Sequence, residues 1–234
     1  MNNTSTIYTE AESDYLKENP TWHVEDSPWK AKQIATMLSQ NNIHPESITE
    51  IGCGVGEILS QLCSKLPDNV TFKGYEISPD AYKMALSREH ERLTFRKEDL
   101  LSQEDEASDV LLVIDVFEHV EDYISFVKKC QSKAKYKIFH IPLDISVLAV
   151  LRDTIMLGRK KYGHLHYFSK ETALATLADN GYKIIDHFYT AGGIDLPRTL
   201  KAKLAKFPRL LLYKLNKDFA VKLLGGHSLL VLAE

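Results

Sequence analysis

Short apolar segments alternate with helical patterns through most of the chain, and this alternation is the feature that most restricts the fold. Apolar runs bounded by turn residues indicate buried strands, and helices between them indicate parallel pairing through crossovers. The sequence therefore predicts an α/β domain with a mostly parallel sheet. The predicted strands are residues 48–52, 71–77, 93–97, 109–115, 136–141, 182–189 and 228–233. The predicted helices between them are 57–66, 79–88, 123–132 and 170–180, the last with Ser169 as N-cap and Gly181 as its C-terminal stop.

Composition excludes several classes of protein. A chain of 234 residues with 44% hydrophobic and 26% charged residues has the usage of a folded globular domain rather than a disordered one. A net charge of −3 argues against a dedicated polyanion-binding protein. The three cysteines, Cys53, Cys63 and Cys130, have no CxxC spacing, which argues against a disulfide framework or a structural zinc site. Without a secretory signal or a spanning apolar run, a cytoplasmic protein is expected.

Three segments lie outside the strand and helix alternation. Residues 1–46 form a predicted N-terminal helical cap, with a helix over 28–39, and residues 47–234 form the main domain. Within that domain, residues 143–168 begin with an apolar helical pattern and are predicted to form a lid that selects the substrate. Residues 191–226 are predicted to form one or two basic amphipathic helices, interrupted by Pro208.

The charge of that third segment leaves two interpretations open. Between residues 198 and 222, eight basic residues face a single acid, Asp218. Such helices can form a hairpin that docks on its own domain and leaves the lysines in solvent. They can also contact an anionic membrane surface from the inner side, or an anionic, lipid-linked substrate.

A strand, a glycine-rich turn and a helix follow one another at residues 48–66. Gly52, Gly54 and Gly56 form GxGxG, and glycine allows positive φ and close approach of a ligand to the main chain. The dinucleotide fingerprint has glycine at the place of Glu57, where an acidic side chain would repel a diphosphate. This favours a nucleotide-type ligand other than a dinucleotide.

Acidic residues follow three successive predicted strands. Glu76 ends the second strand, twenty residues after Gly56, where a carboxylate can accept hydrogen bonds from a ribose diol. Glu98 and Asp99 follow the third strand, and Asp115 the fourth. The carboxyl edge of the sheet is therefore predicted to favour a cationic ligand.

These segments together resemble a known family. ExGCGxGE at 50–57, YEIS at 75–78, EDL at 98–100 and DVFEHVED at 115–122 are similar to motifs of class I S-adenosylmethionine-dependent methyltransferases. The similarity is greatest to the small-molecule branch that includes ubiquinone-biosynthesis methyltransferases. It covers residues 47–142 well and the rest of the chain more loosely. It implies a Rossmann-like three-layer sandwich with a seven-stranded sheet in the order 3-2-1-4-5-7-6 and an antiparallel last strand.

The resemblance also implies a cofactor, S-adenosyl-L-methionine, and the residues that bind it. Glu50 and the 52–56 loop would contact the methionine moiety, Glu76 the ribose, Asp99 with Leu100 the adenine, and Asp115 with Phe117 the sulfonium end. The implied cofactor-binding set is Glu50, Gly52, Cys53, Gly54, Gly56, Glu76, Ile77, Asp99, Leu100, Asp115, Val116 and Phe117.

Two histidines are candidate catalytic residues. His119 follows the fourth strand and has an ordinary pKa near neutrality, so it could act as a general base for a hydroxyl nucleophile. It could equally cap the next helix or orient its loop. His166 in GHLHYFS ranks second, with a packed aromatic turn as the alternative. No carboxylate follows His164 and His166 at ligand spacing, so no metal is expected.

The expected function is transfer of a methyl group to O or N of a small or lipid-linked metabolite, with oxygen slightly preferred because His119 offers a base. One alternative is a partner protein that binds S-adenosylmethionine without turnover. Another is an NAD(P)-dependent oxidoreductase, against which Glu57 and the lack of a Tyr-x-x-x-Lys motif argue. The lack of an Asn/Asp-Pro-Pro-Tyr motif argues against nucleic acid as the acceptor.

Overall fold

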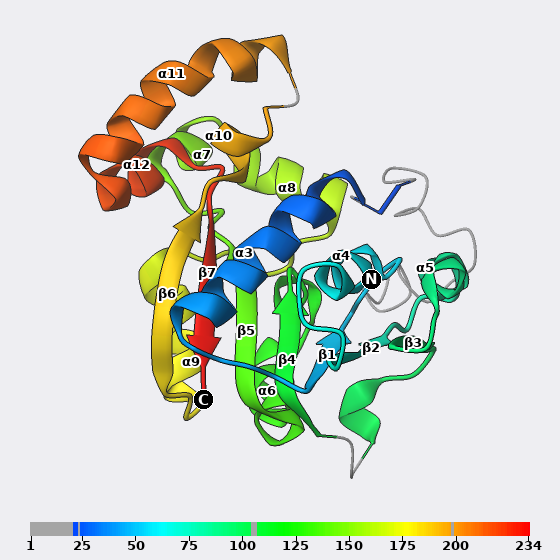
Figure 1. The fold of residues 1–234 in the computed structure, drawn as a ribbon. Helices are drawn as coiled ribbons and strands as arrows, with labels where there is room; N and C mark the ends of the chain where they lie inside the picture. The colour runs from blue at the N-terminus through cyan, green and yellow to red at the C-terminus, as the bar shows by residue number, and fades with distance from the viewer. Residues whose placement is uncertain (1–20, 23, 104–106, 198) are drawn as a thin grey trace.

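A seven-stranded sheet forms the centre of the molecule in the order β3-β2-β1-β4-β5-β7-β6 (Figure 1). This computed structural model describes residues 21–22, 24–103, 107–197 and 199–234. The strands from β1 to β5 pair in parallel, and β7 pairs antiparallel with both β5 and β6, so the predicted order is confirmed. The strands are β1 (Ser47–Ile51), β2 (Thr71–Tyr75), β3 (Leu93–Arg96), β4 (Ser108–Ile114), β5 (Ala134–Pro142), β6 (Ile184–Thr190) and β7 (Ser228–Ala233).

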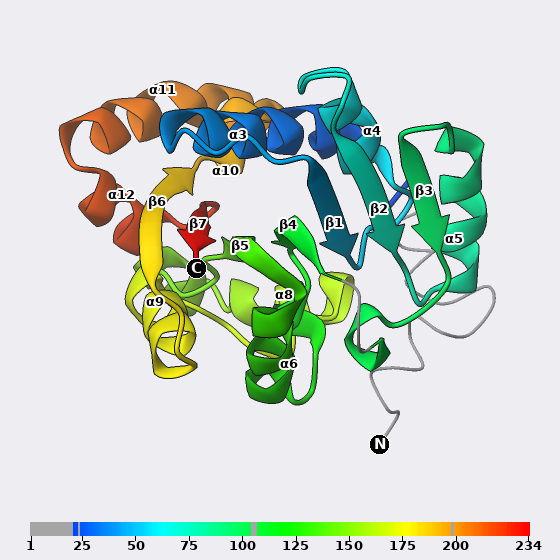
Figure 2. The same ribbon diagram turned by 60° about the horizontal axis from the view of Figure 1, so that its bottom comes forward.

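Helices cover both faces of the sheet, as Figure 2 shows. One face carries α3 (Ser27–Gln40) and α4 (Glu57–Cys63), and the other carries α6 (Tyr123–Cys130) and α9 (Lys170–Asp179). Helix α5 (Pro79–Ala85) packs beside β3. The predicted Ser169 cap of α9 is confirmed as a capping box with Thr172, and Gly181 follows the helix with φ of 85°. The result is the predicted three-layer sandwich.

Alternation along the central strands divides the core into two layers. In β4, Val110, Leu112 and Ile114 pack in the layer beneath α3 and α4. The intervening Leu111 and Val113 pack in the layer beneath α6 and α9. Because successive side chains of a strand point to opposite faces, a strand that is apolar throughout must be covered on both sides. Helix α3 takes part fully in the first layer, through residues that include Ile34, Met37 and Leu38.

Five further helices extend beyond the carboxyl ends of the parallel strands (Figure 1). Helices α7 (Val147–Leu151) and α8 (Thr154–Tyr162) follow β5, whereas α10 (Gly192–Asp195), α11 (Leu200–Leu215) and α12 (Lys217–Leu224) connect β6 to β7. Pro208 lies inside α11 and does not end it, so the predicted interruption there is wrong. The helices separate instead at Asn216, whose side chain accepts a hydrogen bond from the Phe219 amide at 2.9 Å. None of the described helices combines the length and apolarity needed to cross a membrane.

Candidate functional site

The glycine turn between β1 and α4 has the backbone that its sequence predicts. Gly52, Gly54 and Gly56 all have positive φ, at 67°, 55° and 76°. A Cβ atom on Gly56 would lie 2.3 Å from the Phe95 ring, and one on Gly52 would lie 2.9 Å from the Val116 side chain. Only glycine fits both the conformation and the space at these two positions. The turn therefore brings bare main chain to the carboxyl edge of the sheet.

Glu76 holds the glycine turn against the end of β2. Its carboxylate accepts hydrogen bonds from the Gly54 amide at 2.8 Å and from the Ser78 amide at 2.7 Å. Burial raises its pKa, whereas these backbone hydrogen bonds lower it. Each carboxylate oxygen can accept a second hydrogen bond, so Glu76 retains acceptor positions for a ligand.

A cavity of about 570 Å³ opens beside this turn. It is strongly acidic, since Lys30 is the only lysine or arginine on its wall among the described residues. Glu57, expected to repel a diphosphate, forms an ion pair with Arg88 at 2.6 Å, so its own charge is partly offset. The acidic lining as a whole still favours a cation over a polyphosphate. The acidic residues of the wall are Glu50, Glu57, Glu76, Glu98, Asp99, Asp115, Glu121 and Asp122.

Glu50 lies at the base of this cavity and is only 1% exposed. Its Oε2 atom has no hydrogen-bond partner among the described residues. Burial raises the pKa of Glu50 well above its ordinary range, although the nearby Lys30 opposes this. An unsatisfied buried oxygen is costly without a partner, so a donor on a bound ligand would stabilise it.

A continuous polar chain runs across the carboxyl edge of the sheet from α3 to β6. Lys30 Nζ lies 2.6 Å from Asp115 Oδ2, and Asp115 Oδ1 lies 2.6 Å from His140 Nδ1. His140 Nε2 lies 2.8 Å from Thr190 Oγ1. Interactions with His140 and Lys30 outweigh burial and hold the pKa of Asp115 well below its usual range. Asp115 also has a φ of 53°, an uncommon conformation that aspartate tolerates better than most residues.

A second cavity, of about 610 Å³, meets the first at Lys30, Asp115 and His119. Helices α7 and α8 form part of its wall through Leu148 and Ile155. The region between β6 and β7 supplies another part, in two glycine pairs at 192–193 and 225–226. The predicted lid segment therefore borders the second cavity, and two ligands held in the two cavities would meet at the three shared residues.

His119 lies where the two cavities meet, but it is not the near-neutral base that the sequence analysis assumed. Burial, followed by the neighbouring His164, lowers the pKa of His119 to about 4. The two imidazole rings lie edge to face at 5.0 Å, and His164 Nδ1 lies 2.7 Å from Asp144 Oδ2. A histidine with so low a pKa is neutral at neutral pH and accepts a proton weakly.

Glu118 joins these histidines in a compact cluster. Ligand atoms of Glu118, His119 and His164 all lie within 4.8 Å of one another. Glu118 is fully buried, and neither carboxylate oxygen has a hydrogen-bond partner among the described residues. Burial, with Asp115 nearby, raises its pKa well above the ordinary range. No carboxylate lies near His164 at ligand spacing in the sequence, but the fold brings the carboxylate of Glu118 to it. The expectation of no metal stays a prediction.

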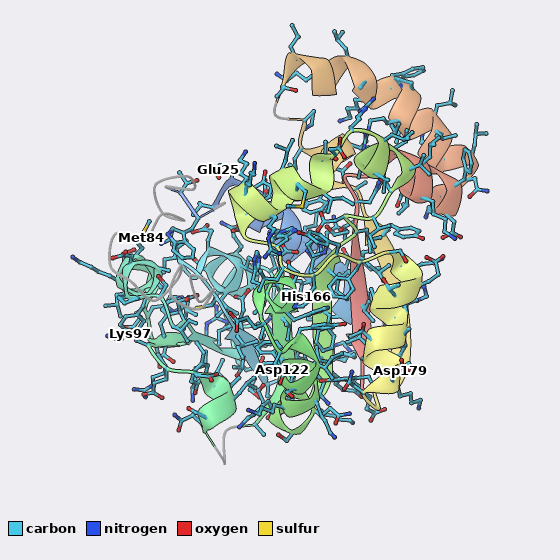
Figure 3. All side chains as sticks on the ribbon, turned by 180° about the vertical axis from the view of Figure 1, so that it is seen from behind. Glu25, Met84, Lys97, Asp122, His166 and Asp179 are labelled. Carbon is cyan, nitrogen blue, oxygen red and sulfur yellow. The ribbon has the colours of Figure 1, made fainter. Side chains whose placement is uncertain are left out.

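His166 has a structural position that differs from the expected one. It borders neither of the two cavities, and its Nε2 atom lies 2.9 Å from the Val120 carbonyl oxygen. Its ring packs on Tyr123 at 4.3 Å, on the face of the molecule drawn in Figure 3, where His166 is labelled. His166 thus links the chain before α9 to the loop that follows β4. These contacts are those of a packed aromatic turn, and the catalytic role of His166 stays a prediction.

Most of the predicted ligand residues meet at the first cavity, but two do not. Glu50, Gly52, Cys53, Glu76, Ile77, Asp99, Asp115 and Val116 line it, while Gly54 and Gly56 shape the turn beside it. Leu100 is 1% exposed and Phe117 is fully buried, and both belong to the core layer beneath α6. These two assignments are corrected to the core, and Leu101 lines the cavity instead of Leu100. Both residues begin short 3₁₀ helices, Leu100–Ser102 and Phe117–His119, a few residues after β3 and β4 end.

Sequence reasoning missed Lys30 and His140. Lys30 belongs to α3, which was treated only as a covering helix, and its polar partner is distant in sequence. His140 lies at the carboxyl end of β5, next to residues already singled out at the end of β4. A polar residue among the apolar ones at the carboxyl end of the strand, in Ile138–Pro142, was the available signal.

Comparison with known proteins gives a consistent result. Residues 24–187 match the family described as "Methyltransferase domain". The structure is similar to magnesium protoporphyrin IX methyltransferase (ChlM) from Synechocystis PCC 6803 with bound SAH, with a TM-score of 0.58, 18% identity and coverage of 98% of this chain and 91% of that one. It is similar to a SAM-dependent methyltransferase from Archaeoglobus fulgidus (TM-score 0.56, 17% identity, coverage 91% and 99%). It is also similar to the N-methyltransferase NodS from Bradyrhizobium japonicum WM9 in complex with S-adenosyl-L-homocysteine. Here the TM-score is 0.57 and the identity 16%, with coverage of 98% of this chain and 95% of that one. No protein of curated function matches the sequence significantly.

Proposed function

Because this chain belongs to the methyltransferase domain family, we propose that it transfers a methyl group from S-adenosylmethionine to O or N of a small or lipid-linked metabolite. The observation that carries the proposal is the meeting of two cavities at Lys30, Asp115 and His119. In-line transfer requires a cofactor and an acceptor that face each other across a short gap. The two cavities provide for that arrangement.

The first cavity fits the proposed cofactor. Bare main chain at Gly52 and the remaining acceptor positions of Glu76 suit a ribose and the atoms linked to it. The unsatisfied oxygen of Glu50 suits an ammonium donor, and the exposed Ile77 with the half-buried Leu101 suits a flat apolar base. The acidic wall suits a sulfonium, which carries a positive charge, better than the diphosphate of a nicotinamide dinucleotide. This favours a methyltransferase over an oxidoreductase.

Positioning contributes more to the proposed reaction than proton removal does. When bound, the sulfonium supplies an electrophilic methyl group, so an aligned nucleophile needs little further activation. Asp115, held by Lys30 and His140, keeps a fixed negative charge beside the point of transfer. His119 can accept a hydrogen bond from the acceptor, but its pKa of about 4 makes it a weak base. Transfer to oxygen is therefore no longer preferred over transfer to nitrogen.

Calorimetric titration tests the cofactor assignment. The protein is titrated with S-adenosylhomocysteine and, separately, with NADH, and the same titrations are made on Glu76→Ala. Binding of S-adenosylhomocysteine that weakens strongly in Glu76→Ala is expected, with no binding of NADH. Since Glu76 also holds the glycine turn, Ile77→Glu serves as a second variant, because Ile77 is 46% exposed and its replacement leaves the core intact. Failure of the wild-type protein to bind S-adenosylhomocysteine would refute the assignment.

A control variant and an activity assay complete this test. Glu46→Gln, at an exposed position before β1, should bind as the wild type does. Methyl transfer to candidate acceptors then separates an enzyme from a protein that binds the cofactor without turnover. Formation of S-adenosylhomocysteine that depends on the acceptor is the expected result.

We further propose that α11 and α12 bring the protein to an anionic membrane surface. Helix α11 exposes a row of large apolar side chains, with Phe207 75% exposed. Basic residues, among them Lys203, Lys206 and Lys214, alternate with this row along the helix. Such a helix can insert its apolar side chains into the acyl region of a bilayer, while its basic side chains contact anionic headgroups. The remaining apolar residues of the row are Leu200, Leu204, Leu211 and Leu215.

A further inference from the structure

Two pairs of glycines enclose an arginine at the far side of the second cavity. Arg209, from α11, lies against Gly193 and Gly226, and its Nη2 atom donates a hydrogen bond to the Gly225 carbonyl at 2.5 Å. A Cβ atom on Gly226 would lie 3.0 Å from Arg209 Nη2, and one on Gly193 would lie 2.9 Å from the Gly226 carbonyl oxygen. Gly193, Gly225 and Gly226 thus make room for the guanidinium within the β6–β7 connection. The Nε atom of Arg209 is buried and has no hydrogen-bond partner among the described residues.

His227 lines the second cavity directly after the second glycine pair. It is 3% exposed, and its ring stacks on Tyr213 at 5.3 Å. No hydrogen bond of good geometry from the described residues reaches either ring nitrogen. Burial, and then Arg209, lower the pKa of His227 to about 4, so the free ring is neutral and carries one N–H donor. The Gly225 carbonyl is a weak partner that raises the pKa of His227 slightly, but it already accepts from Arg209, so a ligand oxygen would give the buried ring a full acceptor.

Arg152 and Arg209 bring two positive charges to one side of the second cavity, whose wall also carries Asp26, Asp115 and Asp144. Arg152, at the end of α7, lines the same cavity, and its charge lowers the pKa of Arg209 beyond the effect of burial. Among the described residues, neither arginine forms an ion pair. The acids around the cavity have partners of their own: Asp115 pairs with Lys30 and His140, and Asp144 with His164. Asp195, the acid near His227, accepts a hydrogen bond from the Trp29 indole at 3.1 Å.

We propose that Arg152 and His227, supported by Arg209, form a subsite for an oxyanion of the methyl acceptor. The proposal rests on the proposed function and deepens it, because it names a chemical class of acceptor: a molecule that carries a phosphate or a carboxylate. Guanidinium and imidazole N–H groups bind such oxygens through charge-assisted hydrogen bonds. The oxyanion would also accept a hydrogen bond from His227, which lines the cavity, while Arg209 adds positive charge behind it.

The position of the subsite gives the acceptor a direction. The same cavity reaches Asp115 and His119 at its junction with the first cavity. An acceptor held by its oxyanion near Arg152 therefore extends its other end toward the point of transfer. The carboxylate of Asp115 at that end repels a second anion, so the anionic group and the nucleophile belong to opposite ends of the acceptor.

Binding of simple oxyanions tests the subsite without knowledge of the acceptor. The wild-type chain, free and with S-adenosylhomocysteine, is titrated with inorganic phosphate and with acetate at constant ionic strength, with chloride as the replaced ion. Saturable binding is followed by the rise in melting temperature and by calorimetry. Arg152→Gln is the principal variant, since Arg152 is exposed and its replacement leaves no buried group unpaired. We expect Arg152→Gln to weaken binding about tenfold, the value of one charge-assisted hydrogen bond.

Arg159→Gln is the matched control, because Arg159 is an exposed arginine of the neighbouring α8 that does not line the cavity. It should bind both anions as the wild type does. His227→Asn is the second cavity variant and should also weaken binding, while circular dichroism verifies its fold. Preference for phosphate or for acetate identifies which oxyanion the subsite takes.

The proposal would be overturned by the absence of saturable binding of both anions, or by equal loss in Arg152→Gln and Arg159→Gln. Equal loss would indicate general charge attraction only. The titrations of the free protein do not depend on S-adenosylhomocysteine. Failure of the subsite is thereby distinguished from failure of the cofactor assignment.

Discussion

Asp115 and His140 lie side by side at the carboxyl ends of β4 and β5, with Oδ1 and Nδ1 2.6 Å apart. Neighbouring parallel strands end at the same edge of the sheet, so the register of β4 and β5 places these residues together. Asp115 reaches the floor shared by both cavities, whereas His140 connects it to Thr190 of β6. The pair therefore links the point of proposed methyl transfer by hydrogen bonds to β6, the strand that precedes helices α10 to α12.

Asp115→Asn is expected to lower stability by about 2 kcal/mol, because it leaves the part-buried Lys30 without its carboxylate. Urea unfolding monitored by circular dichroism measures this change. Asp68→Asn, at a fully exposed aspartate, should change stability by no more than about 0.5 kcal/mol. Equal effects of the two substitutions would show that the Lys30–Asp115–His140 chain adds nothing to stability.

His119 should make the protein less stable in mild acid. Its pKa is about 4 in the folded protein, against roughly 6.5 in an unfolded chain. Between pH 6.5 and pH 4 the folded state therefore binds fewer protons than the unfolded chain. The free energy of unfolding is unaffected by His119 above pH 6.5 and decreases as the pH falls toward 4. The loss is on the order of 3 kcal/mol. The measured quantity is the difference in unfolding free energy between the wild type and His119→Asn at several pH values. A difference that does not vary with pH contradicts the burial of His119.

Gly56→Ala should destabilise the protein by more than about 3 kcal/mol, since it combines a positive φ with a clash against Phe95. Adding Phe95→Leu should restore part of that loss by removing the clash. Gly158→Ala is the control, because Gly158 is in α8 with no atom closer than 3.9 Å to the added Cβ. That substitution should raise stability by about 0.5 kcal/mol. Thermal unfolding compares all three variants.

Glu118→Gln should alter stability by less than about 1 kcal/mol, because its raised pKa keeps the carboxyl group neutral and glutamine has nearly the same shape. In the same experiments, EDTA should leave the melting temperature of the wild type unchanged. A melting temperature that falls with EDTA, and a strong loss in Glu118→Gln, would show that the cluster with His119 and His164 holds a metal.

Phe207→Glu should weaken sedimentation with anionic liposomes, because it places a charge in the exposed apolar row of α11. Ile124→Glu, at an exposed apolar position of α6, should sediment as the wild type does. Raising the salt concentration should release the wild type, since the basic residues act through screened charges. Binding to neutral and anionic liposomes alike, or to neither, would contradict the proposed docking.

The buried strands, the glycine turn and the acids at the strand ends could be predicted from the sequence, because each depends on a local pattern, whereas the strand order was implied only by the family resemblance. Apolar runs such as 109–115 identify buried strands, and a turn that needs positive φ selects glycine at Gly52 and Gly56. Parallel strands deliver their ends to one edge, so Glu76, Asp99 and Asp115 meet at one cavity. These features follow from covalent geometry and side-chain periodicity.

Only the tertiary structure decided which polar groups are paired, buried or left without a partner. Lys30, Asp115 and Thr190 are distant in the sequence, yet His140 and Asp115 connect them into one chain. The pKa of His119 depends on burial beneath residues that follow β5, which no local pattern reveals. Likewise, Gly193, Gly225 and Gly226 lie near the two ends of the β6–β7 connection, and the fold brings them together around Arg209. Electrostatic energies depend on distance and solvent exposure in three dimensions, and the sequence specifies these only through the complete fold.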